Sequence, residues 1–218
     1  MIFRIKNCVV SFNELQKLVR EKQFLTYANV NSFRIKTDLN IKFKYTADGW
    51  PVAAYLSFIK RKKIPKLTCF RIENFWRAQT HEKKAIVIGY EEELLPGIIV
   101  QATKHGWKFE KVYNGYYDHD QYIDILRREV FQNNVELVFL GTGQPNQELL
   151  MNRLAFLEGY CSIVACGAFI LQSLKLDTPL SLKADKFGLT PLIRFKTRPL
   201  TLFKRTFLSL PFLFTSLK

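Results

Sequence analysis

Residues 135–148, VELVFLGTGQPNQE, join a short apolar run to a glycine-containing turn and then to the start of a helix. The run reads as a strand buried on both faces, which is typical of parallel strands covered by helices. The two glycines allow close backbone approach, and free N–H groups at a helix start attract phosphate. A tight turn that merely needs glycine explains the same residues. The stretch is neither a P-loop nor a GxGxxG fingerprint.

Strand-like and helix-like segments alternate on both sides of this stretch. The apolar patterns predict strands at residues 1–6, 24–30, 41–45, 85–89, 107–113, 135–140 and 161–166. Helices are predicted at residues 11–22, 51–62 and 118–133, before 105 and from 145 onward. This order predicts a doubly wound, Rossmann-like α/β domain with a mostly parallel sheet and helices on both faces. Ligands of such sheets bind beyond the carboxyl ends of the strands, so the loops there form the candidate site.

The chain has the size of one domain with an appendage. It contains 218 residues, of which 48% are hydrophobic and 24% charged, and this composition excludes a disordered or collagen-like protein. From about residue 180 the sequence becomes basic and rich in aromatic and aliphatic side chains. We therefore expect an α/β domain at residues 1–180, carrying the site, and a basic helical appendage at residues 181–218.

Positive charge is concentrated at the two ends of the chain. The net charge is +14, from 33 Lys and Arg against 19 Asp and Glu. Residues 1–66 carry 14 basic and 4 acidic side chains, residues 67–182 carry 11 and 14, and residues 183–218 carry 8 and 1. This excess predicts a polyanionic partner, which could be a nucleic acid, a phosphorylated substrate or an anionic lipid.

The cysteines and histidines do not form a metal-binding pattern. Cys8, Cys69, Cys161 and Cys166 have no CxxC spacing, and the three histidines are scattered, so zinc is not expected. The cysteines lie in apolar stretches and read as buried free thiols, which suits a reducing compartment. The N-terminus lacks the apolar core of a signal peptide, and no apolar run reaches the ~20 residues of a membrane-spanning helix. We expect a cytoplasmic protein, or one bound to the inner face of the cell membrane.

Asp48 lies where a predicted strand passes into a predicted helix, in the sequence TADGWP at residues 46–51. An aspartate at such a position is often only a helix N-cap. However, it is one of only four acidic residues among the first 66, and it follows the carboxyl end of a strand. Asp48 is therefore also a candidate general base.

Several of these segments occur together in one known family. Asp48-Gly49, the turn at residues 141–148, the sequence CGAF at residues 166–169 and the basic aromatic tail stand in one order. That order resembles the WecB/TagA/CpsF glycosyltransferases, or glycosyltransferase family twenty-six, from about Phe24 to the C-terminus. The resemblance implies the Rossmann-like fold of the GT-E type. It also implies an inverting, metal-independent enzyme that moves a sugar from a UDP-sugar to a polyprenyl-diphosphate-linked amino sugar, such as undecaprenyl-diphosphate-GlcNAc, in cell-surface polysaccharide synthesis.

The same resemblance implies the residues of the site. Asp48 corresponds to the catalytic base and Gln147 to a glutamine of the active site. The implied donor-binding residues are Asn29, Gly89, Asn114, Gly115, Tyr116, Gly141, Gly143, Gln144, Pro145 and Glu148. The implied contacts to the acceptor and its diphosphate are Tyr27, Lys66, Arg194, Arg198 and Arg205. No metal and no cofactor are expected, and the donated sugar is open among N-acetylmannosamine-type sugars, galactose and glucose.

The tail and one internal run of cations are candidate membrane contacts. Arg194, Arg198 and Arg205 are interleaved with bulky apolar residues, as in a segment that lies in a membrane interface. A C-terminal helix that packs on the domain explains the same pattern. The run Lys60-Arg61-Lys62-Lys63 reads as a solvated helix end, or as a second basic surface facing the membrane.

Two other function classes remain open from the sequence. The charge and an aromatic content of 14% suit a nucleic-acid-binding protein, although no RNP, KH, zinc-finger or helix-turn-helix pattern is present. An inactive, membrane-docking scaffold is the other, because the positions around Tyr27, Lys66 and Tyr90 depart from the family's usual residues. We expect no nucleic-acid partner, and a homo-oligomer is possible.

Overall fold

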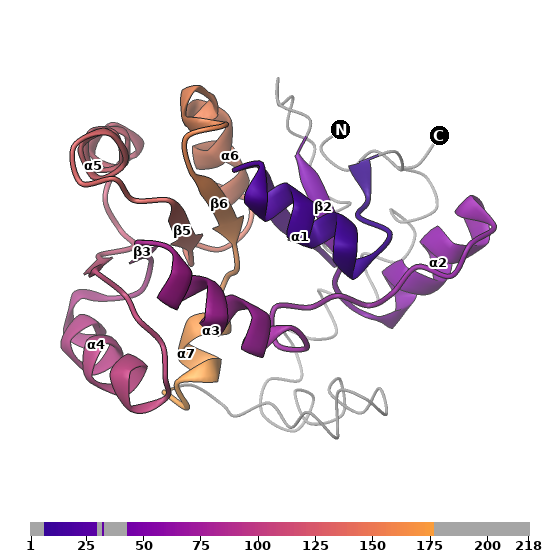
Figure 1. Cartoon of the computed structure of the whole chain (residues 1–218), viewed down its shortest axis with the longest axis horizontal. Helices are drawn as coiled ribbons and strands as arrows, with labels where there is room; N and C mark the ends of the chain where they lie inside the picture. The colour runs from indigo at the N-terminus through magenta and orange to yellow at the C-terminus, as the bar shows by residue number, and fades with distance from the viewer. Residues whose placement is uncertain (1–6, 30–31, 33–42, 177–218) are drawn as a thin grey trace.

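The computed structural model describes residues 7–29, 32 and 43–176. Their centre is a sheet of six strands in the order β2-β1-β6-β5-β3-β4, and every neighbouring pair is parallel (Figure 1). The strands are β1 (Phe24–Ala28), β2 (Lys44–Ala47), β3 (Ala85–Ile88), β4 (Lys111–Tyr113), β5 (Leu137–Leu140) and β6 (Ser162–Ala165). The predicted doubly wound, parallel α/β fold is confirmed.

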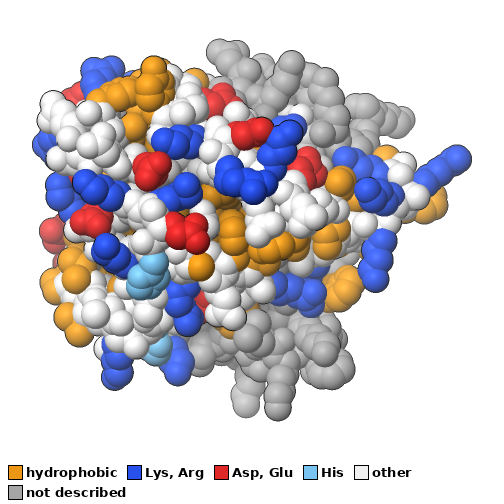
Figure 2. Space-filling view, viewed as in Figure 1, with side chains coloured by type: hydrophobic (Ala, Val, Ile, Leu, Met, Phe, Trp, Pro, Cys, Tyr) orange, Lys and Arg blue, Asp and Glu red, His pale blue; other side chains and the backbone are white. Residues whose placement is uncertain are grey.

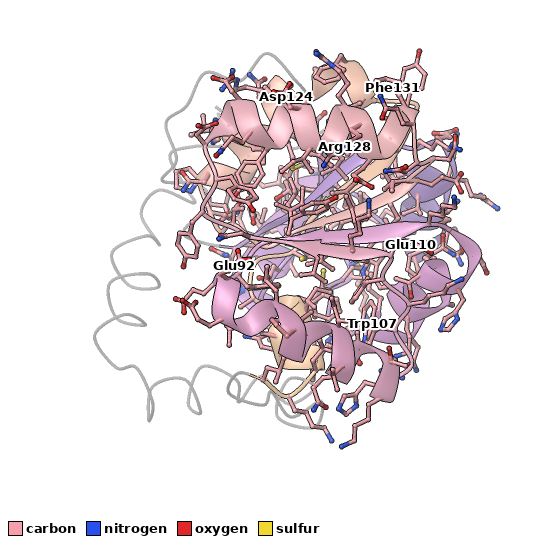
Figure 3. All side chains as sticks on the ribbon, turned by 90° about the vertical axis from the view of Figure 1, so that its left-hand side faces the viewer. Glu92, Trp107, Glu110, Asp124, Arg128 and Phe131 are labelled. Atoms are coloured by element: carbon pink, nitrogen blue, oxygen red, sulfur yellow. The ribbon has the colours of Figure 1, made fainter. Side chains whose placement is uncertain are left out.

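Helices cover both faces of this sheet. On one face, α2 (Trp50–Lys60), α5 (His119–Phe131) and α6 (Asn146–Arg153) contribute Leu56, Leu126 and Leu150 to one apolar cluster. On the other face, α1 (Phe12–Arg20), α3 (Glu73–Glu82), α4 (Leu95–Lys104) and α7 (Phe169–Ser173) build a second cluster around Trp76 and Phe139. Seen from the side, α5 and α4 lie on opposite faces of the sheet (Figure 3). Short 3-10 turns, η3 (Glu92–Leu94) and η4 (Ala155–Leu157), precede α4 and follow α6.

The register aligns the carboxyl ends of the strands. Ala28 of β1 pairs with Ala47 of β2, and Leu140 of β5 pairs with both Ile88 of β3 and Ala165 of β6. The strands β1, β3, β5 and β6 are buried along their whole length, because helices pack on both sides of them. The loops that follow the strands therefore meet along one edge.

Local signals account for most helix starts. Ser11 Oγ accepts a hydrogen bond from the Glu14 backbone N–H at 3.1 Å, and the Glu14 side chain accepts one from the Val10 N–H. Asp118 and Gln121 form a reciprocal capping box at the start of α5. Residues close in sequence thus determine where α1 and α5 begin.

Two predictions need correction. The strand expected at residues 107–113 is formed only by residues 111–113. Before it, the Trp107 indole donates to Ser173 Oγ and the Lys108 N–H donates to Thr80 Oγ1, so the chain there is bound to α7 and α3 rather than to a strand. We predicted no helix at residues 73–82, where α3 lies.

Other predictions lie outside the described residues: the strand at 1–6 and the appendage at 181–218, with Arg194, Arg198 and Arg205. Within the described ranges, no helix is long and apolar enough to cross a membrane.

Candidate functional site

Asp48 directly follows β2 and precedes α2. Its backbone N–H donates to the Ala28 carbonyl at 2.8 Å, which extends the β1–β2 pairing by one step and holds Asp48 beside the end of β1. The N-cap of α2 is Gly49, and no side chain caps the helix. The interpretation of Asp48 as an N-cap is therefore wrong. Its side chain is partly exposed at the carboxyl edge of the sheet.

The loop between β5 and α6 is bound to the same end of β1. Gln144 Nε2 donates to the Tyr27 carbonyl at 3.2 Å, and Gln144 Oε1 accepts from Ser32 Oγ at 2.9 Å. Asp48 and this loop therefore contact the carbonyls of adjacent residues, Ala28 and Tyr27. Gln144, expected to bind the donor, uses its amide to hold the loop in place.

Glu148 is the centre of a buried hydrogen-bond cluster. Its Oε1 accepts from Thr26 Oγ1 at 2.8 Å and from the side-chain amides of Gln144 and Gln147 at 2.9 Å each. Burial raises the pKa of the Glu148 carboxyl, and these three hydrogen bonds oppose that shift. The side chain is fully buried. Glu148 thus positions the residues around it through Oε1, while its Oε2 has no hydrogen-bond partner among the described residues.

Three buried oxygen atoms of residues 141–148 remain unsatisfied. Thr142 Oγ1, Gln147 Oε1 and Glu148 Oε2 have no hydrogen-bond partner within the part of the chain that the structure describes. Buried polar atoms are normally paired, so an unpaired one at a site edge is available to a ligand. Gln147 and Glu148, which were expected from the sequence, and Thr142, which we did not predict, are all of this kind.

Three of the expected donor-binding glycines pack against one another. A Cβ on Gly89 would lie 2.8 Å from the Gly141 Cα, and one on Gly115 would lie 2.5 Å from the Tyr90 nitrogen. A Cβ on Gly141 would lie 2.8 Å from the Tyr90 ring. The ends of β3, β4 and β5 can approach this closely only because these residues lack a side chain.

The outer part of the β5–α6 loop is open. Gly143 has a φ of +77°, which favours glycine, and a Cβ there would meet nothing within 4 Å. Pro145, which follows a cis peptide bond, is exposed. The Gly143 carbonyl accepts the Gln147 N–H at 2.9 Å, so the turn folds directly into α6. This half of the loop can face a ligand.

The loop after β4 presents an exposed aromatic ring. Asn114 Nδ2 donates to Glu92 Oε2 at 2.8 Å, and Asn114 Oδ1 accepts the Tyr116 N–H at 2.8 Å. Figure 3 shows Glu92 at one end of the sheet and Glu110 at the other. Asn114 therefore shapes the loop, while the Tyr116 side chain is 73% exposed and free to stack on a planar ligand.

The expected acceptor contacts have different surroundings. The Tyr27 hydroxyl accepts from the Trp76 indole at 3.2 Å inside the apolar core, and burial raises its pKa. This places Tyr27 in packing rather than at a surface. Lys66 pairs with Ala47 in a parallel bridge, which puts a cation next to the end of β2. The Asn29 carbonyl accepts a hydrogen bond from the Ser32 N–H, and the Asn29 N–H donates one to Ser32 Oγ.

Several residues near the site were not predicted. Thr26 is the small polar residue at the centre of the otherwise apolar or aromatic strand β1, a signal that could have marked it. The Arg71 guanidinium lies 5.7 Å from the centre of the Trp50 ring, two residues beyond Asp48. Only the fold brings Arg71 there. Tyr90 donates to the Gly167 carbonyl at 2.8 Å and closes the packing beneath Gly141.

The described cysteines are all free thiols. Cys8, Cys69 and Cys161 are buried free thiols as predicted, and Cys166 is partly exposed. Burial raises the pKa of Cys166 to about 12, so its thiol stays protonated near neutral pH. Among the described residues, no group of three or more His, Cys, Asp or Glu could hold a metal ion.

The chain matches the model of a known protein family. A family model described as "Glycosyl transferase WecG/TagA/CpsF family" matches residues 5–218, which is nearly the whole chain. No curated protein matches the chain. The match therefore covers Asp48, the β5–α6 loop and the tail together.

Proposed function

Because the chain belongs to the WecG/TagA/CpsF glycosyltransferase family, we propose that it transfers a sugar from a UDP-sugar to a polyprenyl-diphosphate-linked amino sugar. The family implies a glycosyltransferase of cell-surface polysaccharide synthesis. The UDP-sugar, the lipid-linked acceptor and the roles of single residues are our proposal.

One observation carries the assignment of residues. The Asp48 N–H and the Gln144 side chain bind the carbonyls of Ala28 and Tyr27, two consecutive residues at the end of β1. A carboxylate and a glycine-containing, helix-opening turn thus flank one strand end, where parallel sheets bind their ligands. This supports a single site with the acceptor hydroxyl near Asp48 and the donor diphosphate near the turn.

In this proposal Asp48 acts as the general base. It accepts the proton of the acceptor hydroxyl while the hydroxyl oxygen forms a bond to the anomeric carbon of the donor. The bond from that carbon to the diphosphate oxygen breaks, its electron pair leaves with UDP, and the configuration inverts. A hydroxyl is a poor nucleophile near pH 7, so such a base contributes roughly 10²–10⁴-fold.

Other groups around the edge suit the donor. A helix start such as that of α6 favours a diphosphate, because its first backbone N–H groups have no partner within the helix; here the Gln147 N–H already binds the Gly143 carbonyl. Gln147 Oε1 and Thr142 Oγ1 are acceptors for sugar or nucleotide hydroxyls. Lys66 and Arg71 supply positive charge near the end of β2, and Tyr116 is placed to stack on the base. We propose that this set works without a metal ion.

A donor screen tests the proposal. The purified chain is incubated with UDP-linked hexoses and N-acetylhexosamines and a short-chain lipid-diphosphate-GlcNAc, with and without EDTA, and UDP release and product mass are measured. We expect one donor to give acceptor-dependent UDP release that EDTA leaves unchanged. Absence of transfer with every donor, together with no UDP binding by calorimetry, contradicts the proposal and favours the inactive scaffold.

A further inference from the structure

The end of α2 carries apolar and basic side chains side by side. Phe58 is 80% exposed and Ile59 is 40% exposed. They are followed at once by Lys60, Arg61, Lys62 and Lys63. Figure 1 shows α2 standing out from the body of the molecule, and Figure 2 shows basic and hydrophobic side chains together at its end. We call residues 58–63 the basic tip.

α2 is apolar on its outer side as well as on its inner side. Val52, Ala53 and Leu56 are buried against the sheet, while Trp50 on the opposite side is 50% exposed, like Phe58 at the tip. From Gly49 to Ile72 the sequence has no acidic residue. A helix that is apolar all round and cationic at its end is suited to a partner that is itself apolar and negatively charged.

The turn that presents these cations is held by specific contacts. Arg61 adopts a left-handed conformation with a φ of 48°, and the Lys62 N–H donates to the Ser57 carbonyl at 3.2 Å. Ser57 Oγ donates to the Ala53 carbonyl at 2.6 Å and accepts the Ile64 N–H at 2.8 Å. Because Ile64 is buried, the chain folds back at once, and the cations project from a fixed turn.

We propose that the basic tip docks on an anionic lipid surface, with Phe58 and Ile59 in the interface and the cations on phosphate headgroups. Interfacial segments combine these two features, and each cation near an anionic membrane adds to the attraction. The assignment to lipid rests on charge complementarity. A protein partner or a second copy would have to supply a dense acidic patch around an apolar one.

The inference rests on the proposed function, since it gives that function's lipid-linked acceptor a route to the site. Asp48 lies just before the first turn of α2, and the tip lies at the last. A helix of 11 residues is about 16 Å long. Docking of the tip would therefore hold Asp48 at a fixed height above the lipid that carries the acceptor.

Vesicle binding by the full chain tests whether the cations of the basic tip contribute to docking. The triple variant Arg61→Gln/Lys62→Gln/Lys63→Gln is compared with Lys83→Gln/Lys104→Gln/Lys108→Gln, which removes the same charge elsewhere. We expect the tip variant to bind phosphatidylglycerol vesicles at least about tenfold more weakly than wild type, and the matched variant to change less than about threefold. Equal binding of both variants and wild type overturns the proposal.

The apolar contact is tested separately. Phe58→Ser should weaken vesicle binding, whereas Val100→Ser, which alters a side chain 64% exposed on α4, should not. In Phe58→Trp, brominated lipid should quench the added fluorescence. Absence of quenching, or a Phe58→Ser protein that sediments as a smaller oligomer than wild type, overturns the proposal, the latter in favour of a second copy at this surface.

Failure of docking and failure of the proposed function can be told apart. Vesicle binding requires no substrate, so it reports on docking even if the chain transfers no sugar. If the donor screen succeeds, the tip variant should keep its turnover on a soluble acceptor and lose turnover on an acceptor embedded in vesicles. Equal loss on both acceptors overturns the docking role.

Discussion

The two halves of the carboxyl edge are built in different ways. At the ends of β1 and β2, side chains hold the loops: Gln144 and Glu148 bind Tyr27 and Thr26. At the ends of β3, β4 and β5, backbone packs directly on backbone through Gly89, Gly115 and Gly141. The first half places the Asp48 carboxylate and the Gln147 amide oxygen at this edge, whereas the second is close-packed backbone. Residues implied together as donor contacts thus divide into those that can touch a substrate and those that shape the site.

The largest expected effect is a loss of turnover, and it comes from a substitution at the ends of β1 and β2, where side chains hold the loops. Asp48→Asn removes the proposed base but keeps the size and the backbone hydrogen bond of the residue. Turnover should fall by roughly 10²–10⁴-fold, while UDP affinity and thermal stability stay close to wild type. Steady-state transfer assays and calorimetry measure both. Asp124→Asn, on the exposed side of α5, is the control. A normal rate in Asp48→Asn would remove Asp48 from the mechanism.

Substitution of a glycine at the ends of β3, β4 and β5 should lower the stability of the fold. Gly141→Ala places a methyl group 2.8 Å from the Tyr90 ring, and overpacking of this kind costs about 3 kcal/mol. Gly97→Ala is the matched control, because a Cβ there meets nothing within 4 Å and alanine favours a helix by roughly 0.5–1 kcal/mol. Urea unfolding compares the two. If Gly141→Ala were as stable as wild type, the close packing of these strand ends would be wrong.

The Glu148 cluster gives a smaller effect that depends on pH. Glu148→Ala leaves three donors without their acceptor and should cost about 2 kcal/mol, whereas Glu148→Gln keeps an acceptor oxygen and should cost less. Burial raises the pKa of Glu148 in the folded state, so its ionisation destabilises the fold as the pH rises through that value. The stability of wild type should therefore fall relative to Glu148→Gln as the pH rises above about 4.5, the ordinary pKa of a glutamate. Parallel pH curves would contradict a buried, perturbed carboxyl.

The smallest expected effect on stability concerns Glu129, which lies outside both halves of the carboxyl edge. Glu129 is buried on α5 and accepts from Tyr113 at 2.6 Å, Lys111 at 2.9 Å and Asn133 at 2.9 Å. Burial raises its pKa, but these hydrogen bonds more than offset that and lower it. Tyr113→Phe should cost about 1 kcal/mol at pH 7. Because a depressed carboxyl pKa stabilises the fold only above it, this difference should shrink below about pH 4.5. Urea unfolding at both pH values tests it, and a cost that grows on acidification would contradict the assignment.

The sequence predicted the sheet well because its strands are short, apolar and separated by helical segments, two of which begin at side-chain caps. It overextended the strand before Tyr113, because Trp107 and Phe109 look like strand residues but pack beside α3 and α7. It missed α3, whose sequence ENFWRAQTHE is largely polar and has no capping side chain. The first error comes from contacts made by residues far apart in the chain, and the second from the lack of a local helix signal.

The sequence predicted where the candidate site residues lie, but it predicted the surroundings of only some of them. Asp48 and residues 141–148 could be assigned to one edge because parallel strands align their carboxyl ends. The sequence does not reveal that Glu148 is fully buried, since an acid in the first turn of a helix is usually exposed and favourable there. Nor does it reveal that Gly89 meets Gly141, because β3 and β5 become neighbours only in the folded sheet.

A crystal structure of the chain with UDP tests most directly whether Asp48 and the β5–α6 loop form one site. The account predicts the diphosphate against residues 141–147, with its terminal phosphate turned toward Asp48 and the uracil near Tyr116. UDP bound at the amino ends of the strands, or on the β5–α6 loop with its diphosphate directed away from Asp48, would contradict it.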